Sequence, residues 1–335
     1  MNDRTVSPAR DRPVEAASRP ALDHLALLAV RGADARSFLD NQLTRNVPVL
    51  EPERSVSRAS IAGYCSPKGR LLASFVVWCE LSPSGETIFM LTSRDIVETV
   101  AKRLRMYVLR AKLAIENVTA VHAIEGFHDS PSLPEVARSL DVWSVQRDGD
   151  VTWVRHPDAD GVKRVMRIGT AASAAPGLPV EAATWRWSEI RAGIPRITAT
   201  TQDRFVPQMV NLEALGGVDF RKGCFPGQEV VARSQYLGKL KRRMALASTD
   251  ASQGDGGVIA QPATDIWSAE DSGPAGLVVN AERGSDGRVA LLVELPLARF
   301  ESPGLTVAES GGPALTIESL PYALPENEVF VRPKL

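Results

Sequence analysis

Hydrophobic residues recur along the first part of the chain with two different periods. The apolar run over residues 22–30 predicts a buried strand, and the apolar positions within 35–43 follow at helical spacing. A strand around 57–64, a turn containing Pro and Gly at 66–69, and an apolar strand over 71–78 then predict a β-hairpin. The chain is therefore expected to begin as a strand and a helix, followed by paired strands.

The same alternation continues to about residue 118. Residues 87–92 predict the second strand of another hairpin, and residues 94–109 predict a helix with Ser93 as its N-cap. Residues 111–118 return as a strand. This order is typical of an antiparallel sheet with helices on one face, so we assign residues 21–118 to a first α+β domain.

A second α+β domain is expected over residues 119–239. The Asp148-Gly149 step predicts a hairpin turn, and residues 181–192 predict a helix that carries Trp185. Short strands are expected at 121–126, 142–147, 151–155 and 163–168.

Beyond residue 240 the pattern changes to short apolar runs separated by Gly, Asp and Pro clusters. Such spacing predicts a small β-barrel over residues 240–335, ending in a polar tail after Tyr322. Residues 1–20 mix four Arg with three acids and three Pro, which predicts a disordered tail. The predicted fold class is thus α+β: two antiparallel α+β domains followed by a small barrel.

The composition is that of an ordinary globular protein. The 335 residues are 44% hydrophobic, enough for two or three cores, and the net charge of −1 lacks the basic excess of most nucleic-acid binders. Three widely spaced cysteines and four scattered histidines suggest neither a disulfide framework nor a metal site, and they fit a reducing, cytoplasmic setting. The apolar run near the N-terminus is too short to cross a bilayer, so no membrane association is expected.

Cys224 is the first candidate for chemistry. Arg221 and Lys222 precede it, and Pro226 suits the first position of a helix. Cationic neighbours and a helix dipole both favour thiolate over thiol. The alternative is a small, unreactive cysteine that fits a glycine-rich turn.

Several polar side chains could line a binding site around this thiol. Gln228 and Glu229 could cap the turn that follows it. Gln208 and Asn211 would share one face of a short helix, where amides can read the edge of a heteroaromatic ring. Solvated helix residues or caps are the alternative.

Two basic stretches could meet anions. Lys68 lies beside Gly69 in the first hairpin turn and could bind a carboxylate or phosphate, although a solvated turn is the alternative. The run 239–243 contains four cations and could touch RNA phosphates, although most such runs are solvated faces or linkers.

Residues 222–229 read K-G-C-F-P-G-Q-E, which resembles the K-G-C-[FY]-x-G-Q-E signature of the YgfZ family, folate-binding proteins of iron–sulfur cluster maintenance. Further segments resemble the approach to this signature, the family's opening G-x-D-A unit, its first-domain turn and its C-terminal end. These segments are 205–218, 30–39, 67–70 and 320–322. The resemblance therefore spans roughly residues 22–325.

The resemblance implies a fold like that of the T-protein of the glycine cleavage system, with two α+β domains and a β-barrel in a ring around a site for tetrahydrofolate or a derivative. It also implies that Cys224 is the functional residue. Together with the polar residues above, the expected cofactor-binding set is Lys222, Gln208, Asn211, Gln228, Glu229, Arg191 and Lys68.

Two positions depart from the T-protein pattern. Ala73-Ser74 stands where T-proteins carry an Asp-Asp pair, so the carboxylate associated with aminomethyl transfer has no obvious counterpart. Arg191 stands where T-proteins have a Glu that reads the pterin, and a guanidinium cannot accept the N–H bonds that a carboxylate accepts. The pterin is therefore expected to be read differently.

The leading hypothesis is a folate-linked accessory protein for iron–sulfur cluster assembly or repair that acts through Cys224 and supports tRNA thiomethylation indirectly. Its expected partners are folate and either iron–sulfur assembly proteins or cluster-containing client enzymes. A folate-dependent one-carbon (aminomethyl or methyl) transferase is the alternative, and an RNA-contacting module is a second alternative.

Overall fold

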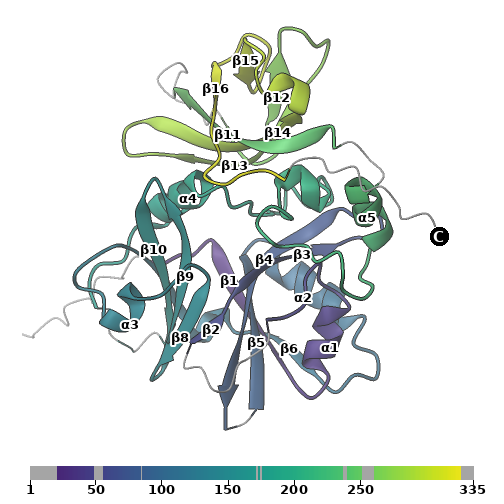
Figure 1. Cartoon of the computed structure of the whole chain (residues 1–335). Coiled ribbons are helices and arrows are strands. Elements are labelled where there is room, and N and C mark those ends of the chain that lie inside the picture. Colours follow the sequence, from purple (N-terminus) through teal and green to yellow (C-terminus); the bar gives the residue numbers. More distant parts are fainter. Residues whose placement is uncertain are drawn as a thin grey trace, which may run out of the picture.

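The computed structural model describes residues 21–48, 56–83, 85–170, 173, 176–236, 240–250 and 260–325. They fold into three antiparallel sheets with a few short helices, which agrees with the expected fold class (Figure 1). The tail expected at residues 1–20 and the end of the expected polar tail, residues 326–335, lie outside the described residues.

The first sheet has the strand order β3-β4-β5-β1-β6, with β5 at its centre. Its strands are β1 (Leu25–Arg31), β3 (Ser60–Cys65), β4 (Leu71–Ser82), β5 (Gly85–Ser93) and β6 (Ala114–Asn117). Side chains alternate along a strand, so the odd-numbered residues of β1 up to Ala29 pack toward the second sheet, and the even-numbered ones pack toward α1 (Ala35–Asp40) and α2 (Val97–Arg105). Burial on both faces explains the continuous apolar run in the sequence.

The second sheet has the order β2-β8-β9-β10-β7. Its strands are β2 (Val56–Arg58), β7 (Ala123–His128), β8 (Ser144–Asp148), β9 (Val151–Ala159) and β10 (Val162–Gly169). Both sheets share one arrangement: three consecutive strands form a meander, and the last of them pairs with the first strand of the segment. These pairs are β5 with β1 in the first sheet and β10 with β7 in the second. Between the two sheets lies an apolar core that includes Trp185 of α4 (Ala182–Arg191). The remaining short helices here are η1 (Thr119–Val121) and α3 (Glu135–Arg138).

Three details differ from the sequence expectations. The strand expected over residues 57–64 is split at Ala59 into β2 and β3, which belong to different sheets. The helix expected over residues 94–109 covers only α2, and Ser93 does not cap it, because the Ser93 hydroxyl donates to Ile197 O at 2.7 Å. β2 comes from the expected first domain, residues 21–118, yet it completes the second sheet. The domain boundaries near 118 and 239 stay predictions.

The third sheet forms a nearly closed barrel with the order β15-β12-β13-β14-β11-β16. Its elements are β11 (Arg242–Asp250), β12 (Asp265–Ser268), β13 (Gly276–Arg283), β14 (Arg288–Pro296), η4 (Leu297–Arg299), β15 (Leu305–Val307) and β16 (Leu315–Glu318). A bridge between Thr306 and Ala314 brings the two edge strands together. The barrel sits above the two sheets, with α4 beneath it (Figure 1).

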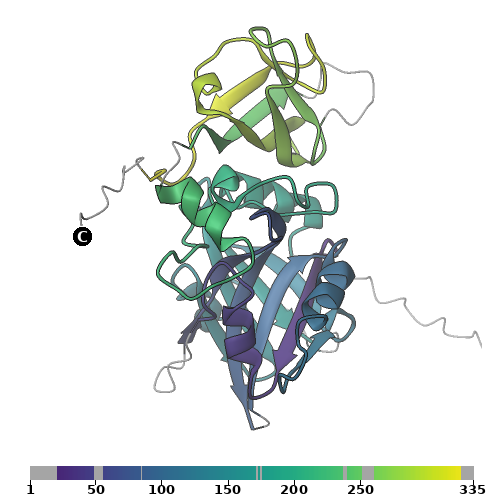
Figure 2. The same cartoon turned by 90° about the vertical axis from the view of Figure 1, so that its right-hand side faces the viewer.

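A long connection between α4 and the barrel joins the three sheets. It contains η2 (Pro207–Val210) and α5 (Gln228–Tyr236), and its apolar residues share one core cluster with residues of β3, β4, β11 and β14. In Figure 2 this connection winds between the sheets below and the barrel above. The sites described next are both built on it.

Candidate functional site

The signature loop, residues 222–228, is fixed by the side chain of Lys222. Its Nζ donates to the carbonyl oxygens of Asp40 and Leu43, the latter at 2.6 Å, and lies 5.4 Å from the centre of the Phe225 ring. Burial lowers the pKa of Lys222 to about 8, against the opposing charges of Asp40 and Asp219. Lys222 therefore ties the loop to the C-terminal end of α1.

The other end of the loop is fixed by backbone contact with the hairpin turn between β3 and β4. A Cβ added to Gly227 would lie 2.5 Å from both the Cα and the N of Gly69. Both glycines have positive φ, +76° and +70°, which side chains rarely adopt. Only glycine permits this approach. It explains why the turn at 67–70 and the signature at 222–229 each have a glycine at this position.

Cys224 is exposed between these two anchors, whereas Cys65 and Cys79 are buried. Burial raises the pKa of both buried thiols to about 12. The sequence expectation placed Pro226 at the first helical position, but α5 begins at Gln228. The left-handed backbone of Gly227 cannot continue into a helix, so Cys224 lies four residues before the helix rather than at its first turn.

Gln208 and Asn211 are buried and hold neighbouring backbone. Gln208 Nε2 donates to Val231 O and Asn211 Nδ2 donates to Met244 O, both at 2.8 Å. They do not share a helix face, because η2 ends at Val210 and Asn211 has φ +55°. These amides hold α5 and β11 against the η2 segment.

Of the remaining expected residues, Lys68, Gln228 and Glu229 flank the Gly69–Gly227 contact, whereas Arg191 lies on α4. Lys68 is exposed in its hairpin turn, Glu229 is exposed and pairs with Arg233 at 2.8 Å, and Gln228 N donates to Phe225 O at 3.1 Å. Arg191 binds Asp160 at 2.8 Å and also binds Glu318. The hydrogen bond with Asp160 is the largest cause that raises the pKa of Arg191. Arg191 thus joins the second sheet, α4 and the barrel.

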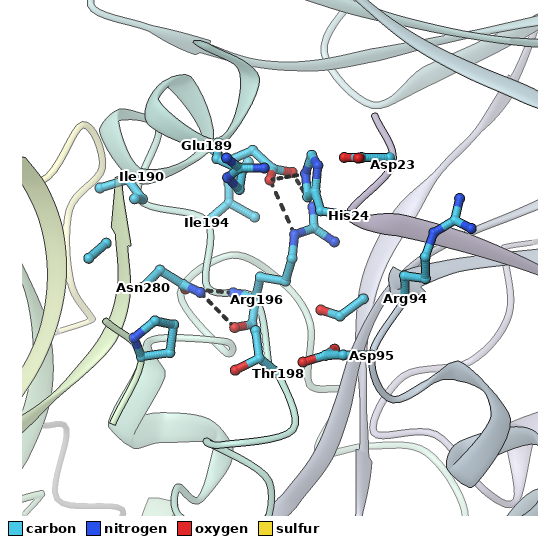
Figure 3. Close-up of a pocket in the computed structure, with 14 residues that line it drawn as sticks. Asp23, His24, Arg94, Asp95, Glu189, Ile190, Ile194, Arg196, Thr198 and Asn280 are labelled. Atoms are coloured by element: carbon cyan, nitrogen blue, oxygen red, sulfur yellow. Dashed lines mark hydrogen bonds and ion pairs between the residues drawn. The ribbon is translucent and has the colours of Figure 1, made fainter. Parts of the chain in front are cut away.

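A cavity of about 450 Å³ lies between one end of the first sheet, α4 and the barrel (Figure 3). It is lined by residues from the start of β1, the end of β5, α4, the 194–198 segment and the barrel. Its lining residues are Asp23, His24, Ser93, Arg94, Asp95, Arg186, Glu189, Ile190, Ile194, Arg196, Thr198, Pro262, Asn280 and Ala281. None of the residues expected from the sequence is among them.

Glu189 is the central polar group of this cavity. Arg196 donates to both of its carboxylate oxygens, and His24 Nε2 lies 3.9 Å from Oε2 (Figure 3). Burial alone would raise the pKa of Glu189, but the charge of Arg196 and its neighbours outweighs burial and holds that pKa well below its usual range. Burial also lowers the pKa of His24. At neutral pH an ionised carboxylate therefore sits beside a neutral imidazole.

The segment that carries Arg196 is held from both sides. Asn280 of the barrel accepts from Arg196 N at 2.9 Å and donates to Arg196 O at 2.8 Å. From the first sheet, Ser74 Oγ accepts from Ile197 N at 3.0 Å and donates to Pro195 O at 3.2 Å. Ser74, at the position of the missing carboxylate pair, positions the wall of the cavity.

Sequence reasoning missed Glu189, His24 and Arg196. The sequence did contain a signal for Glu189. It lies on the same helix two residues before Arg191, and side chains at i and i+2 point to different sides of a helix, so the two residues have different surroundings. With Arg191 directed at Asp160 and Glu318, Glu189 faces the cavity. His24 and Arg196 had no such signal, since only the tertiary fold brings them to Glu189.

The basic run at 239–243 does not form a free patch in the part of it that is described. Arg242 pairs with Glu294 and Arg243 pairs with Glu213 at 2.6 Å, the latter pair being buried. Across the described ranges, no cluster of His, Cys, Asp or Glu could hold a metal ion. The helices within those ranges are also too short or too polar to cross a membrane.

The three-sheet arrangement defines the fold. A solved structure of the glycine cleavage system aminomethyltransferase T from Bartonella henselae is similar, with a TM-score of 0.61 over 91% of this chain and 87% of that one, at 15% identity. This likeness confirms the expected T-protein-like fold.

Similarity in sequence is more specific. The tRNA-modifying protein YgfZ of Serratia proteamaculans (strain 568) is 28% identical over 322 residues, 92% of this chain and 93% of that protein. The protein of the same name from Escherichia coli O157:H7 (strain EC4115 / EHEC) is 28% identical over 318 residues, 91% of this chain and 93% of that one. No protein-family model matches the chain. The resemblance to the YgfZ family is confirmed over nearly the whole length.

Proposed function

We propose that this chain is a folate-linked accessory protein that supports the assembly or repair of iron–sulfur clusters, and thereby tRNA modification, through Cys224. The observation that carries the proposal is an exposed thiol in a loop that is fixed at both ends, by Lys222 and by the contact of Gly227 with Gly69. A thiol held this way meets a partner in one defined position. The similarity to proteins named tRNA-modifying YgfZ supplies the biological context.

The folate part of the proposal rests on the central cavity. Its volume of about 450 Å³ is in the range of small-molecule sites. The ionised Glu189 can accept N–H bonds from a 2-amino-4-oxo heterocycle such as a pterin, the task that Arg191 cannot perform. Glu189, His24 and Arg196 would hold the heterocycle, and a tetrahydrofolate would supply its one-carbon or reducing chemistry there.

Cys224 would act together with a partner rather than alone. Common iron–sulfur clusters are held by four thiolates, and the other two cysteines of this chain are buried, with their pKa values raised. The thiol would therefore touch either a cluster carried by a client enzyme or a thiol of an assembly protein. Assembly proteins and cluster-containing enzymes are the partners this proposal requires.

Neither alternative gains support from a specific contact. For a one-carbon transferase, Ser74 offers a hydroxyl that is already bonded to Pro195 and Ile197. For an RNA module, Arg242 and Arg243 of the basic run are paired with glutamates. The accessory role is the one that uses the exposed thiol.

The test is rescue of an E. coli strain that lacks its own YgfZ, with the activity of cluster-dependent enzymes and the level of thiomethylated tRNA as readouts. The wild-type chain should restore both, and Cys224→Ala should restore neither at equal abundance. Gly223→Ala is the matched control, because its added Cβ meets no atom within 4 Å. Full rescue by Cys224→Ala would remove the thiol from the mechanism.

A further inference from the structure

Three bulky apolar side chains stand exposed just after α2. Met106, Tyr107 and Leu109 have exposed fractions of 67%, 45% and 88%. The turn that carries them is ordered, since Tyr107 N donates to Leu104 O at 3.0 Å and Ala111 N donates to Val108 O at 2.8 Å. Val108 packs against the core. Contiguous apolar side chains on an ordered surface mark an interaction site more often than scattered ones do.

Leu109 also has a backbone conformation that leucine rarely adopts. Its φ is +45°, in the left-handed region that glycine and asparagine favour. Glycine would relieve this strain. A leucine here is 88% exposed, so burial offsets little of the backbone strain, which indicates a role outside the folded chain.

The surroundings of these residues are strongly basic. Residues 99–115 contain five cations and no acid, in a chain whose net charge is −1. Lys102, Arg110 and Lys112 are exposed, while the guanidinium of Arg105 is bonded to Ile115 O at 2.8 Å. We call Lys102, Met106, Tyr107, Leu109, Arg110 and Lys112 the α2 patch. It has an apolar centre and a cationic rim.

The α2 patch lies close to the signature loop, with α1 between them. At one end of α1, Asp34 Oδ2 accepts from Lys112 N at 2.7 Å, and at the other end Asp40 O accepts from Lys222 Nζ. The six residues of α1 span about 9 Å at 1.5 Å per residue. A protein interface of ordinary size, about 800 Å² per partner, is large enough to cover both.

We propose that the α2 patch docks a protein partner that offers an apolar hollow rimmed by acidic side chains, placed so that the partner also reaches Cys224. Met, Tyr and Arg are enriched in protein interfaces, and a few buried apolar anchors contribute most of the affinity. RNA would use the cations and Tyr107 but gains little from Met106 and Leu109, so a protein fits better. This inference rests on the proposed function for the identity of the partner, a client or assembly protein.

The test uses a random peptide library displayed on phage and selected on the full chain. Selected peptides should combine apolar residues with acidic ones, and a recovered peptide should bind Leu109→Gly and Arg110→Glu at least about tenfold more weakly than wild type. Leu178→Gly and Lys163→Glu are matched controls: Leu178 is 89% exposed, Lys163 is also exposed, and both lie in the second α+β region. The controls should bind like wild type.

A folding defect is separated from lost binding by thermal melting. Leu109→Gly should melt no lower than wild type while losing the peptide, because glycine suits the positive φ. Recovery of only basic or neutral peptides, or of peptides that ignore Leu109→Gly, would overturn the proposal. So would tighter binding to unmodified tRNA or to phosphatidylserine vesicles than to the peptides, if that binding depends on Leu109.

The peptide-binding test of the α2 patch does not depend on Cys224. Peptide binding by the α2 patch together with failure of the wild-type chain to rescue would contradict the proposed function alone. Full rescue by Leu109→Gly and Arg110→Glu, with Cys224→Ala inactive, would contradict the docking role alone.

Discussion

Gly227 of the signature loop and Gly69 of the first hairpin turn are in direct backbone contact. A Cβ on Gly227 would lie 2.5 Å from Gly69 N and 2.5 Å from Ser66 O, while one on Gly69 would lie 2.8 Å from Val230 Cβ. Two segments far apart in the sequence are thus locked together without hydrogen-bonding side chains. The position of Cys224 follows from this contact and from the bonds of Lys222.

Gly227→Ala should therefore destabilise the chain and displace the loop. The added methyl group meets backbone atoms that cannot rotate away, and alanine is strained at φ +76°. We expect a loss of about 1–3 kcal/mol in the free energy of unfolding, measured by urea denaturation. Gly223→Ala, in the same loop but with open space around it, should change this free energy by less than about 0.5 kcal/mol. Equal effects of the two substitutions would show that the contact does not fix the loop.

Lys222 should make stability depend on pH in the alkaline range. Its pKa is lowered by burial from 10.5 to about 8, so between these values the unfolded chain binds more protons than the folded chain. Stability contributed through this group therefore rises as pH increases from about 8 toward 10.5. The measurement is the difference in unfolding free energy between wild type and Lys222→Met across that range. A constant difference would mean that the amine titrates normally.

The sequence was informative where a pattern depends on neighbours in the chain. The apolar run of β1 and the turn at Gly149, between β8 and β9, were readable because burial on both faces and positive φ leave local signatures. The split of β2 from β3 was not, because one continuous extended stretch without a turn residue at Ala59 contributes strands to two sheets. The signature located Cys224, but the cavity is assembled from His24, Glu189 and Arg196, whose meeting depends on the tertiary fold.

Gln208 shows that spacing in the sequence does not fix the direction of a side chain. Spacing of three suggested that it shares a helix face with Asn211, yet the left-handed backbone at Asn211 turns each amide toward a different carbonyl. Amide side chains that satisfy buried backbone look the same in sequence as amides that read a ligand. Only the positions of Val231 and Met244 distinguish the two roles.

Cys224 should be the one thiol that reacts rapidly in the native chain. Cys65 and Cys79 are buried, and their pKa values are raised to about 12, so at pH 8 they are almost entirely protonated. With Ellman's reagent we expect one fast thiol and two that react at least about 100-fold more slowly, until the chain is unfolded. Cys224→Ser should abolish the fast phase and leave the slow phases unchanged. A fast phase that survives in Cys224→Ser would place the accessible thiol elsewhere.

Glu189, rather than Arg191, should decide folate affinity. Glu189 lies in the cavity with Arg196 and His24, whereas Arg191 is bound to Asp160 and Glu318 and does not line the cavity. Hydrogen bonds to a charged group contribute about 1.5–3 kcal/mol, so Glu189→Gln should weaken tetrahydrofolate binding by roughly 10- to 100-fold, and Arg191→Gln by less than about twofold. Calorimetric titration at pH 7.5 is suitable, because burial holds the pKa of His24 below 6.5 and keeps its ring neutral there. A larger loss in Arg191→Gln than in Glu189→Gln would move the pterin site to the interface between α4 and the barrel, and no binding by wild type would end the folate proposal.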